Sequence, residues 1–290
     1  MHKPVLVKEV IKFLNPQRNQ NFIDATYGFG GHSKELLKYI KPKGKILAFE
    51  WDPFLVELNK KNLMQEKNII LKNANFTEIK KIVKELNFTK IKGVIFDLGI
   101  SSWHLENSKR GFSFNKDEFL DMRINPKEIK ITAFEVVNYY SKERLIEILK
   151  NYGEEKRAKE IVDAILDKRR FKKIETSKEL AEIIMNVCKR KNKIHPATKT
   201  FMALRTFINN ELENLEEGLK QAFDVLDKNG RIAIITFQGL EDKVVKKVFK
   251  ELKRKGAKMI TKNVVRPSRN EILENPRSRS AKLRVIQKNG

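Results

Sequence analysis

The sequence predicts an α/β fold in which a mostly parallel, doubly wound sheet is interrupted by a block of helices. Short apolar runs alternate with helical segments through the first hundred residues; the alternation stops between about Lys109 and Lys193 and then resumes. Short apolar runs bounded by turn residues are typical of strands buried on both faces. Such strands separated by helices indicate βαβ units and therefore a parallel sheet.

The first part of the chain supplies three of these strands. Residues 5–14 carry apolar side chains that suit a docking helix or the entry from a strand into a helix. Strands are predicted in "NFIDAT" (21–26), "KILAFEW" (45–51) and "KGVIFDLGI" (92–100). Helices are predicted between them in "SKELLKYIK" (33–41), "FLVELNKKNLM" (54–64) and "FTEIKKIVKEL" (76–86).

The middle of the chain predicts helices and no strong strand. Apolar residues recur at the spacing of one helix face in 145–152, 158–165 and 180–187. "TSKE" at 176–179 predicts a capping box, with Thr176 as the N-cap and Glu179 bonding back to it.

The α/β pattern then returns with one long helix, whose apolar stripe runs from Leu204 to Leu226. A strand at 230–237 and a helix at 241–252 follow, and two late apolar runs at 257–263 and 282–287 predict an antiparallel hairpin at the sheet edge. We therefore expect a discontinuous Rossmann-like domain made of residues 1–108 and 194–290, with a helical insertion at 109–193.

Composition narrows the class of protein. Lys and Arg number 61 against 37 Asp and Glu, a net charge of +24, which favours a nucleic-acid partner over a small acidic substrate. No apolar run approaches the length of a membrane span, so no membrane is expected. The single cysteine, Cys188, excludes a disulfide within the chain and fits the cytoplasm. The four histidines lack metal-ligand spacing, so no metal is expected.

A glycine loop, "DATYGFGGHS" (24–33), follows the first predicted strand. Such a loop lets a ligand approach the backbone at the start of the next helix. Ser33 stands where a nicotinamide dinucleotide site would have its third spaced glycine, and the Lys-Ser or Lys-Thr of a P-loop is absent. The loop therefore fits a pyrophosphate ligand poorly.

Three carboxylates fall where predicted strands end. They are Asp24 beside the glycines, Glu50 in "AFEWDP" and Asp97 in "FDLG". Each alone is more often a surface or capping acid, but ligands of open α/β sheets bind at the carboxyl ends of strands. Together the three favour an adenosine-containing cofactor, and two hydroxyls, a cationic centre and no phosphate would suit S-adenosylmethionine.

Ordered blocks along nearly the whole chain carry a family resemblance. They are "HKPVLVKEV" (2–10), "DATYGFGGHS" (24–33), "DLGISS" (97–102), "RGFSF" (110–114), "LDMR" (120–123), "YGEEKRAKEI" (152–161), "HPATKTFMALR" (195–205), "NNELENLE" (209–216) and "NPRSRSAKLR" (275–284). In these blocks the chain resembles the RsmH (MraW) family of bacterial ribosomal RNA methyltransferases.

The resemblance implies a class I methyltransferase fold with a helical insertion that serves as the RNA substrate domain. It implies transfer of a methyl group from S-adenosylmethionine to the exocyclic N4 of a cytidine in the decoding region of 16S rRNA. The partner would be 16S rRNA in the small ribosomal subunit or in a late assembly intermediate. The implied cofactor-binding residues are Gly30, Gly31, His32, Glu50, Phe76, Asp97 and His104.

The chain departs from the family pattern at several positions. Glu50 replaces the usual Asp, and His104 replaces the usual Gln. In "TFQGLEDK" (236–243), Gln238, Gly239 and Lys243 replace residues of the family's Ser-Phe-His-Ser-Leu-Glu-Asp-Arg. These changes keep open a second hypothesis, a non-enzymatic RNA-binding or assembly factor. A third, a nicotinamide oxidoreductase, is disfavoured by Ser33.

The catalytic residue is left open by the sequence. The N4 amine is a poor nucleophile, and the Pro-Pro-aromatic segment of many amino-methyltransferases is missing after Asp97. Asp97 is a weak catalytic candidate, and a cofactor role is favoured for it. The candidate RNA phosphate contacts are Arg110, Arg123, Arg205, Arg277, Arg279, Lys282 and Arg284.

Overall fold

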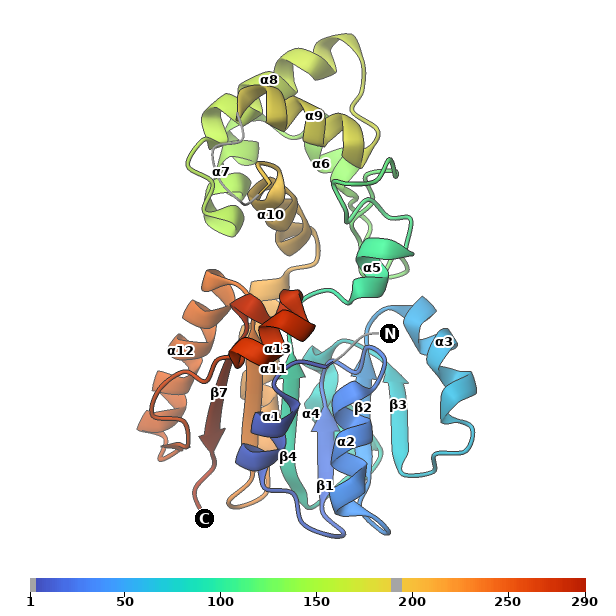
Figure 1. Cartoon of the computed structure of the whole chain (residues 1–290), viewed down its shortest axis with the longest axis vertical. Coiled ribbons are helices and arrows are strands. Elements are labelled where there is room, and N and C mark those ends of the chain that lie inside the picture. The colour runs from blue at the N-terminus through green and yellow to red at the C-terminus, as the bar shows by residue number, and fades with distance from the viewer. Residues whose placement is uncertain (1–3, 189–194) are drawn as a thin grey trace. The chain divides into compact units, whose positions relative to one another are not determined.

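Seven strands form a single sheet in the order β3-β2-β1-β4-β5-β7-β6, in a computed structural model that describes residues 4–188 and 195–290 (Figure 1). Strands β1 to β5 pair in parallel, and β7 runs antiparallel to both β5 and β6. The predicted class I methyltransferase sheet, with its late antiparallel edge, is confirmed. The strands are β1 (Asn21–Asp24), β2 (Ile46–Glu50), β3 (Ile69–Asn73), β4 (Ile91–Asp97), β5 (Arg231–Thr236), β6 (Lys258–Met259) and β7 (Lys282–Gln287).

The register of the central strands brings the strand-end acids to one edge. Asp24 pairs with Ala48 of β2 and with Ile95 of β4. Glu50 and Asp97 therefore each stand two residues beyond the partner of Asp24, on either side of it. The glycine loop leaves the sheet at this edge.

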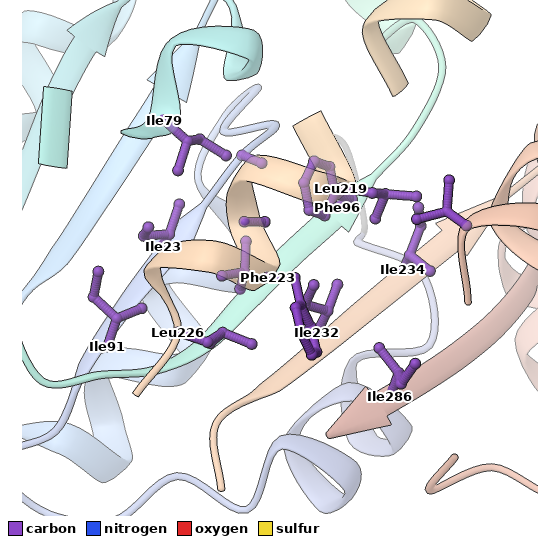
Figure 2. Close-up of a cluster of buried hydrophobic side chains, with 14 of the residues drawn as sticks. Ile23, Ile79, Ile91, Phe96, Leu219, Phe223, Leu226, Ile232, Ile234 and Ile286 are labelled. Atoms are coloured by element: carbon purple, nitrogen blue, oxygen red, sulfur yellow. The ribbon is translucent and has the colours of Figure 1, made fainter. Parts of the chain in front are cut away.

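Residues Met1–Gly99 and Leu212–Gly290 form one compact unit, which we call the sheet unit. Helices α4, α11 and α12 cover one face of its sheet, and α1 and α2 cover the other. Figure 2 shows Leu219 and Phe223 of α11 facing Phe96 and Ile232 of the strands. Its helices are α1 (Val7–Leu14), α2 (Gly31–Ile40), α3 (Pro53–Leu63), η1 (Phe76–Glu78), α4 (Ile79–Glu85), α11 (Glu211–Val225, which begins one residue before the unit), α12 (Gly239–Arg254), α13 (Arg269–Glu274) and η2 (Pro276–Ser280).

Strand β3 corrects the sequence analysis, which predicts only helices between the second and third apolar runs. Its five residues, IILKN, lie at the edge of the sheet, and only Ile69 is buried. A strand at an edge has no need for a continuous apolar run, so its pattern is weak.

Residues Ile100–Glu211 form the second compact unit, which we call the helical unit. The predicted insertion at 109–193 lies within it, and the predicted end of the insertion falls among residues 189–194, outside the described residues. All three periodic stretches are helices, and Thr176 and Glu179 form the predicted capping box. The helices are α5 (Ser102–Glu106), α6 (Ala133–Tyr139), α7 (Lys142–Gly153), α8 (Ala158–Phe171), α9 (Ser177–Val187) and α10 (Thr198–Ile208).

The single long helix predicted around 204–226 is wrong, because the chain breaks into α10 and α11 at Asn209 and Asn210. Asn210 takes a left-handed conformation with φ 47°. The buried Asn209 side chain accepts a hydrogen bond from the Ile124 amide (2.7 Å) and donates one to the Met122 carbonyl (2.8 Å). These long-range bonds fix the break, although the apolar stripe continues through it.

Candidate functional site

The glycine loop turns tightly into α2. Gly30 has φ 73°, and a Cβ atom there would lie 2.4 Å from the Tyr27 hydroxyl oxygen, so only glycine fits. Helix α2 begins at Gly31, and its N-cap, Gly30, offers no side-chain cap. The first-turn amides of α2 are therefore available to a ligand carboxylate or another acceptor.

Glu50 is held at the end of β2 by two backbone amides. Its Oε2 accepts a hydrogen bond from the Gly28 amide and its Oε1 accepts one from the Asp52 amide, each at 2.9 Å. Burial raises the pKa of this carboxyl from 4.5 to about 7, although the two amide bonds oppose the rise. Each oxygen has a second lone pair, so the ionised side chain can still accept two hydroxyl groups.

His32, Asp97, Asp24 and Ser33 form a buried polar cluster between the glycine loop and β4. His32 Nε2 lies 3.4 Å from Asp97 Oδ2, and Ser33 Oγ donates to Asp24 Oδ2 at 2.6 Å. Within the described residues, His32 Nδ1 and Asp97 Oδ1 are buried without a hydrogen-bond partner, and His32 Nε2 has only the Asp97 carboxylate beside it. Buried polar atoms in this state are costly, and a ligand that bonds to them would remove the cost.

The fold shifts the protonation of this cluster. Burial raises the pKa of Asp24, and the hydrogen bond from Ser33 offsets part of the rise. Burial alone would lower the pKa of His32, but Asp97, Asp24 and Glu271 together outweigh it, so the pKa is raised. These shifts favour the protonated form of Asp24 and the protonated form of His32.

Phe76, the predicted apolar wall, begins η1, and two residues separate it from the end of β3. Its ring meets the Phe96 ring edge-on, with 5.5 Å between centroids. A Cβ atom at Gly218 would lie 2.4 Å from the Phe76 ring, so glycine there makes room for the ring. Phe76 is only partly buried, which leaves part of it for contact with a ligand.

His104 belongs to the helical unit, unlike the other predicted cofactor residues. Its Nδ1 accepts a hydrogen bond from the Ser101 amide at 3.2 Å, which helps to start α5. The ring packs edge-on against Trp103 and Phe112 and is buried. These contacts indicate a structural role for His104. Its predicted contact with the cofactor stays a prediction.

The predicted RNA contacts in the helical unit make bonds within the protein. Arg123 pairs with Asp121 (Nε–Oδ1 2.7 Å), and Arg205 pairs with Glu211 (Nε–Oε1 2.6 Å). Arg110 Nη1 donates to the carbonyls of Arg123 and Ile124. These arginines already contribute to the fold of their own unit.

The C-terminal candidates divide into two kinds. "NPRSRSAKLR" docks as η2 followed by β7, rather than forming a loose basic tail. Arg284 pairs with Asp242 (Nε–Oδ1 2.7 Å), and Lys282 lies 3.9 Å from the same carboxylate. Arg277 and Arg279 are exposed on η2. The RNA role of all seven basic residues stays a prediction.

The departures at 236–243 lie where β5 enters α12. Gln238 is the N-cap of α12, and the amides of Phe237 and Gln238 both donate to Glu241 Oε2. Thr236, the last residue of β5, has a buried hydroxyl oxygen without a partner. Since β5 is the neighbour of β4, these residues follow the strand next to Asp97.

Two supporting residues are absent from the sequence analysis. Asn59 is buried in α3 and donates through Nδ2 to the Gly28 carbonyl at 2.7 Å. Thr26 Oγ1 accepts a hydrogen bond from the Asp97 amide at 2.7 Å. A polar residue one turn after Leu55 and Val56, on the buried side of α3, is the one signal that points to Asn59.

In the described part of the chain, no cluster of three His, Cys, Asp or Glu side chains could hold a metal ion. None of the helices in these residues combines the length and the hydropathy of a membrane span.

Known proteins match the chain over its length. Ribosomal RNA small subunit methyltransferase H of Persephonella marina is 44% identical over 292 residues, with 99% of each chain covered. The protein of the same name from Caldicellulosiruptor bescii is 40% identical over 304 residues, again with 99% of each covered. The solved structure of an rRNA methylase from Streptococcus thermophilus is 12% identical to this chain, with a TM-score of 0.48. The match covers 100% of this chain and 99% of the methylase. We assign the fold from the strand order and not from this similarity. Residues 1–289 match the sequence model of the MraW methylase family, and the chain therefore belongs to that family.

Proposed function

We propose that this chain transfers a methyl group from S-adenosylmethionine to the exocyclic N4 of a cytidine in the decoding region of 16S rRNA. The observation that carries the proposal is the edge where Glu50, His32 and Asp97 meet the glycine loop, in a chain of a methylase family. The names of the relatives, small-subunit rRNA methyltransferases, support the substrate class.

The residues at this edge fit the cofactor. Glu50 offers acceptors for the two ribose hydroxyls, and Phe76 offers a partly exposed ring beside the adenine. The first turn of α2 offers amides for the amino-acid end. Asp97 Oδ1 and His32 Nδ1 are buried polar atoms left to bond with a ligand.

S-adenosylmethionine supplies an electrophilic methyl group on a sulfonium when bound. The protein then has to place the amine in line and exclude water. Two contacts fix Asp97 at the end of β4. Its amide donates a hydrogen bond to Thr26 Oγ1, and its carboxylate lies beside His32 Nε2. We assign Asp97 to the cofactor first, and its Oδ1 is the candidate acceptor for an N–H of the incoming amine.

The target base must leave its stack to reach such a site. We propose the helical unit, including the predicted insertion 109–193, as the RNA-binding part of the protein. The net charge of +24 supports attraction to rRNA in the small subunit or in a late assembly intermediate.

The test is transfer of labelled methyl from S-adenosylmethionine to small ribosomal subunits and to naked 16S rRNA, followed by nucleoside mass spectrometry. We expect N4-methylcytidine at one decoding-region position, and loss of transfer in Asp97→Ala. Binding of rRNA without any methyl transfer would instead support the second hypothesis, a non-enzymatic assembly factor. The departures from the family pattern at Gln238, Gly239 and Lys243 favour that hypothesis.

A further inference from the structure

Leu6 is held in a backbone conformation that leucine rarely adopts. It has φ 54° and ψ 33°, in the left-handed region, and its side chain is fully buried. This conformation is strained for a non-glycine residue, because the Cβ atom approaches the following carbonyl oxygen. Leu6 is the N-cap of α1, and its carbonyl accepts the first helical hydrogen bond from Val10.

Glu271 of α13 holds this residue from the other end of the chain. Its Oε1 accepts the hydrogen bond of the Leu6 amide at 2.7 Å, across 265 residues of sequence. Ser268 caps α13 by accepting a hydrogen bond from the Glu271 amide. Downstream, β7 pairs with β5, and Leu283 of β7 bridges to Val265. Glu271 is therefore attached to the sheet on both sides of α13.

The segment held by Glu271 lies against the glycine loop. A Cβ atom at Gly31 would be 2.9 Å from Pro4, so the Pro4 ring sits directly on Gly31. Val5 and Leu6 pack in the same apolar cluster as Tyr27 and the α2 residues. Residues 4–6, which we call the N-terminal strap, thus lie against Gly31, the residue before His32 in the first turn of α2.

We infer that Glu271 is a positioning residue for the cofactor site, because it fixes the strap that holds Gly31 and His32 in place. The inference rests on the proposed function, in which these residues bind S-adenosylmethionine. Without the carboxylate, the Leu6 amide would lose its partly buried acceptor, and the strained backbone of Leu6 would relax away from Gly31.

The experiment compares three variants of the full chain: Glu271→Ala, Glu271→Gln and the control Glu274→Gln. Glu274 is an exposed residue on the same helix, so its replacement removes the same charge from α13. Affinity for S-adenosylhomocysteine is measured by calorimetry, and exchange of the Leu6 amide is measured by NMR. We expect Glu271→Ala to lose roughly tenfold in affinity and to speed Leu6 exchange at least about tenfold. Glu271→Gln keeps an acceptor oxygen and should stay within about threefold of the unaltered chain on both measures.

A folded Glu271→Ala variant with unchanged affinity, or with unchanged Leu6 exchange, would overturn the inference. A tenfold loss in the control would also overturn it, because charge on α13 would then be the cause. If Glu271→Ala does not fold, Glu271→Gln is compared with the unaltered chain: parallel changes in Leu6 exchange and in affinity, each within the expected threefold, support the inference, and a change in Leu6 exchange without a change in affinity overturns it. Neither readout needs rRNA, so failure of methyl transfer leaves the result readable. If the unaltered chain does not bind S-adenosylhomocysteine, the proposed function fails, and the claim that Glu271 positions a cofactor site fails with it.

Discussion

Beside exposed ion pairs such as Lys80 with Asp224, the sheet unit contains buried carboxyl groups, whereas no Asp or Glu in the described part of the helical unit is buried. In the sheet unit, Glu50, Asp24 and His32 are buried at the glycine loop, and the fold raises the pKa of each. In the helical unit, the prominent ionic groups are partly exposed pairs, as in Arg123 with Asp121, and the pKa of Glu179 is lowered, chiefly by Lys172.

This difference distinguishes the candidate ligand site in the sheet unit from side chains that only stabilise the fold. Buried polar atoms without partners are retained mostly where a ligand or a reaction needs them. His32 and Asp97 at the glycine loop have such atoms, and Thr236 has one at the end of the neighbouring strand; in the described part of the helical unit only the Thr200 hydroxyl compares. Paired charges instead stabilise the fold and leave fewer groups for ligands.

The pH dependence of stability tests the buried acids of the sheet unit most directly. Glu50 has a pKa of about 7 in the fold against 4.5 ordinarily, so between these values the folded chain keeps a proton that the unfolded chain has lost. The free energy of unfolding should therefore fall as pH rises from about 4.5 to 7, by on the order of 3 kcal/mol from this group. Asp24 and His32 add slopes of the same sign.

Chemical denaturation of the unaltered chain and of Glu50→Gln across this range measures the effect. The variant should show a smaller fall with pH than the unaltered chain. Parallel curves for the two proteins would mean that Glu50 is not the buried acid described here.

Replacement of Glu50 also tests the ligand side of the comparison. Glu50→Gln removes the charged acceptor for two hydroxyls and should weaken S-adenosylhomocysteine binding about a hundredfold. Glu50→Asp restores the carboxylate usual at this position of the RsmH (MraW) family and should bind within about tenfold of the unaltered chain. Calorimetry at pH 8, where Glu50 is ionised, measures both, and equal affinities for Gln and Glu would contradict the assignment.

A change in the helical unit should affect stability and leave the cofactor site intact. Asn209→Ala leaves the Ile124 amide and the Met122 carbonyl without their buried partner and should cost about 2 kcal/mol. The denaturation midpoint measures the loss, and calorimetry should find unchanged affinity for S-adenosylhomocysteine. A large loss of affinity would show that the two units are not independent in this respect.

The smallest expected effect concerns the capping box of α9. Thr176→Ala removes the acceptor for the Glu179 amide and should cost about 1 kcal/mol. Thr176→Ser is the matched control, since serine keeps the hydroxyl and should restore most of the stability. The thermal unfolding midpoints of the three proteins measure the effect. Equal midpoints for the alanine and serine variants would contradict a capping role for the Thr176 hydroxyl.

Local chemistry explains which parts of the fold can be predicted from the sequence. The continuous apolar runs of β1, β2, β4 and β5 and the capping box at Thr176 are signals carried by neighbouring residues. The edge strand β3 lacks a continuous run, and the break at Asn209 depends on partners more than eighty residues away.

The candidate site shows the same division. Glu50 and Asp97 can be found because strand ends are visible in the sequence, and His32 because it lies in the glycine loop. The support that Asn59 gives to Gly28 and that Glu271 gives to Leu6 crosses 31 and 265 residues, so no local pattern records it.

The bond between Leu6 and Glu271 has a consequence for synthesis of the chain on the ribosome. Residues of the N-terminal strap are made before their partner in α13, which follows 265 residues after Leu6. A nascent chain can therefore contain the glycine loop, Glu50 and Asp97 long before the strap is secured. A chain truncated before residue 271 would carry every predicted cofactor residue and still lack the side chain that binds Leu6 beside Gly31.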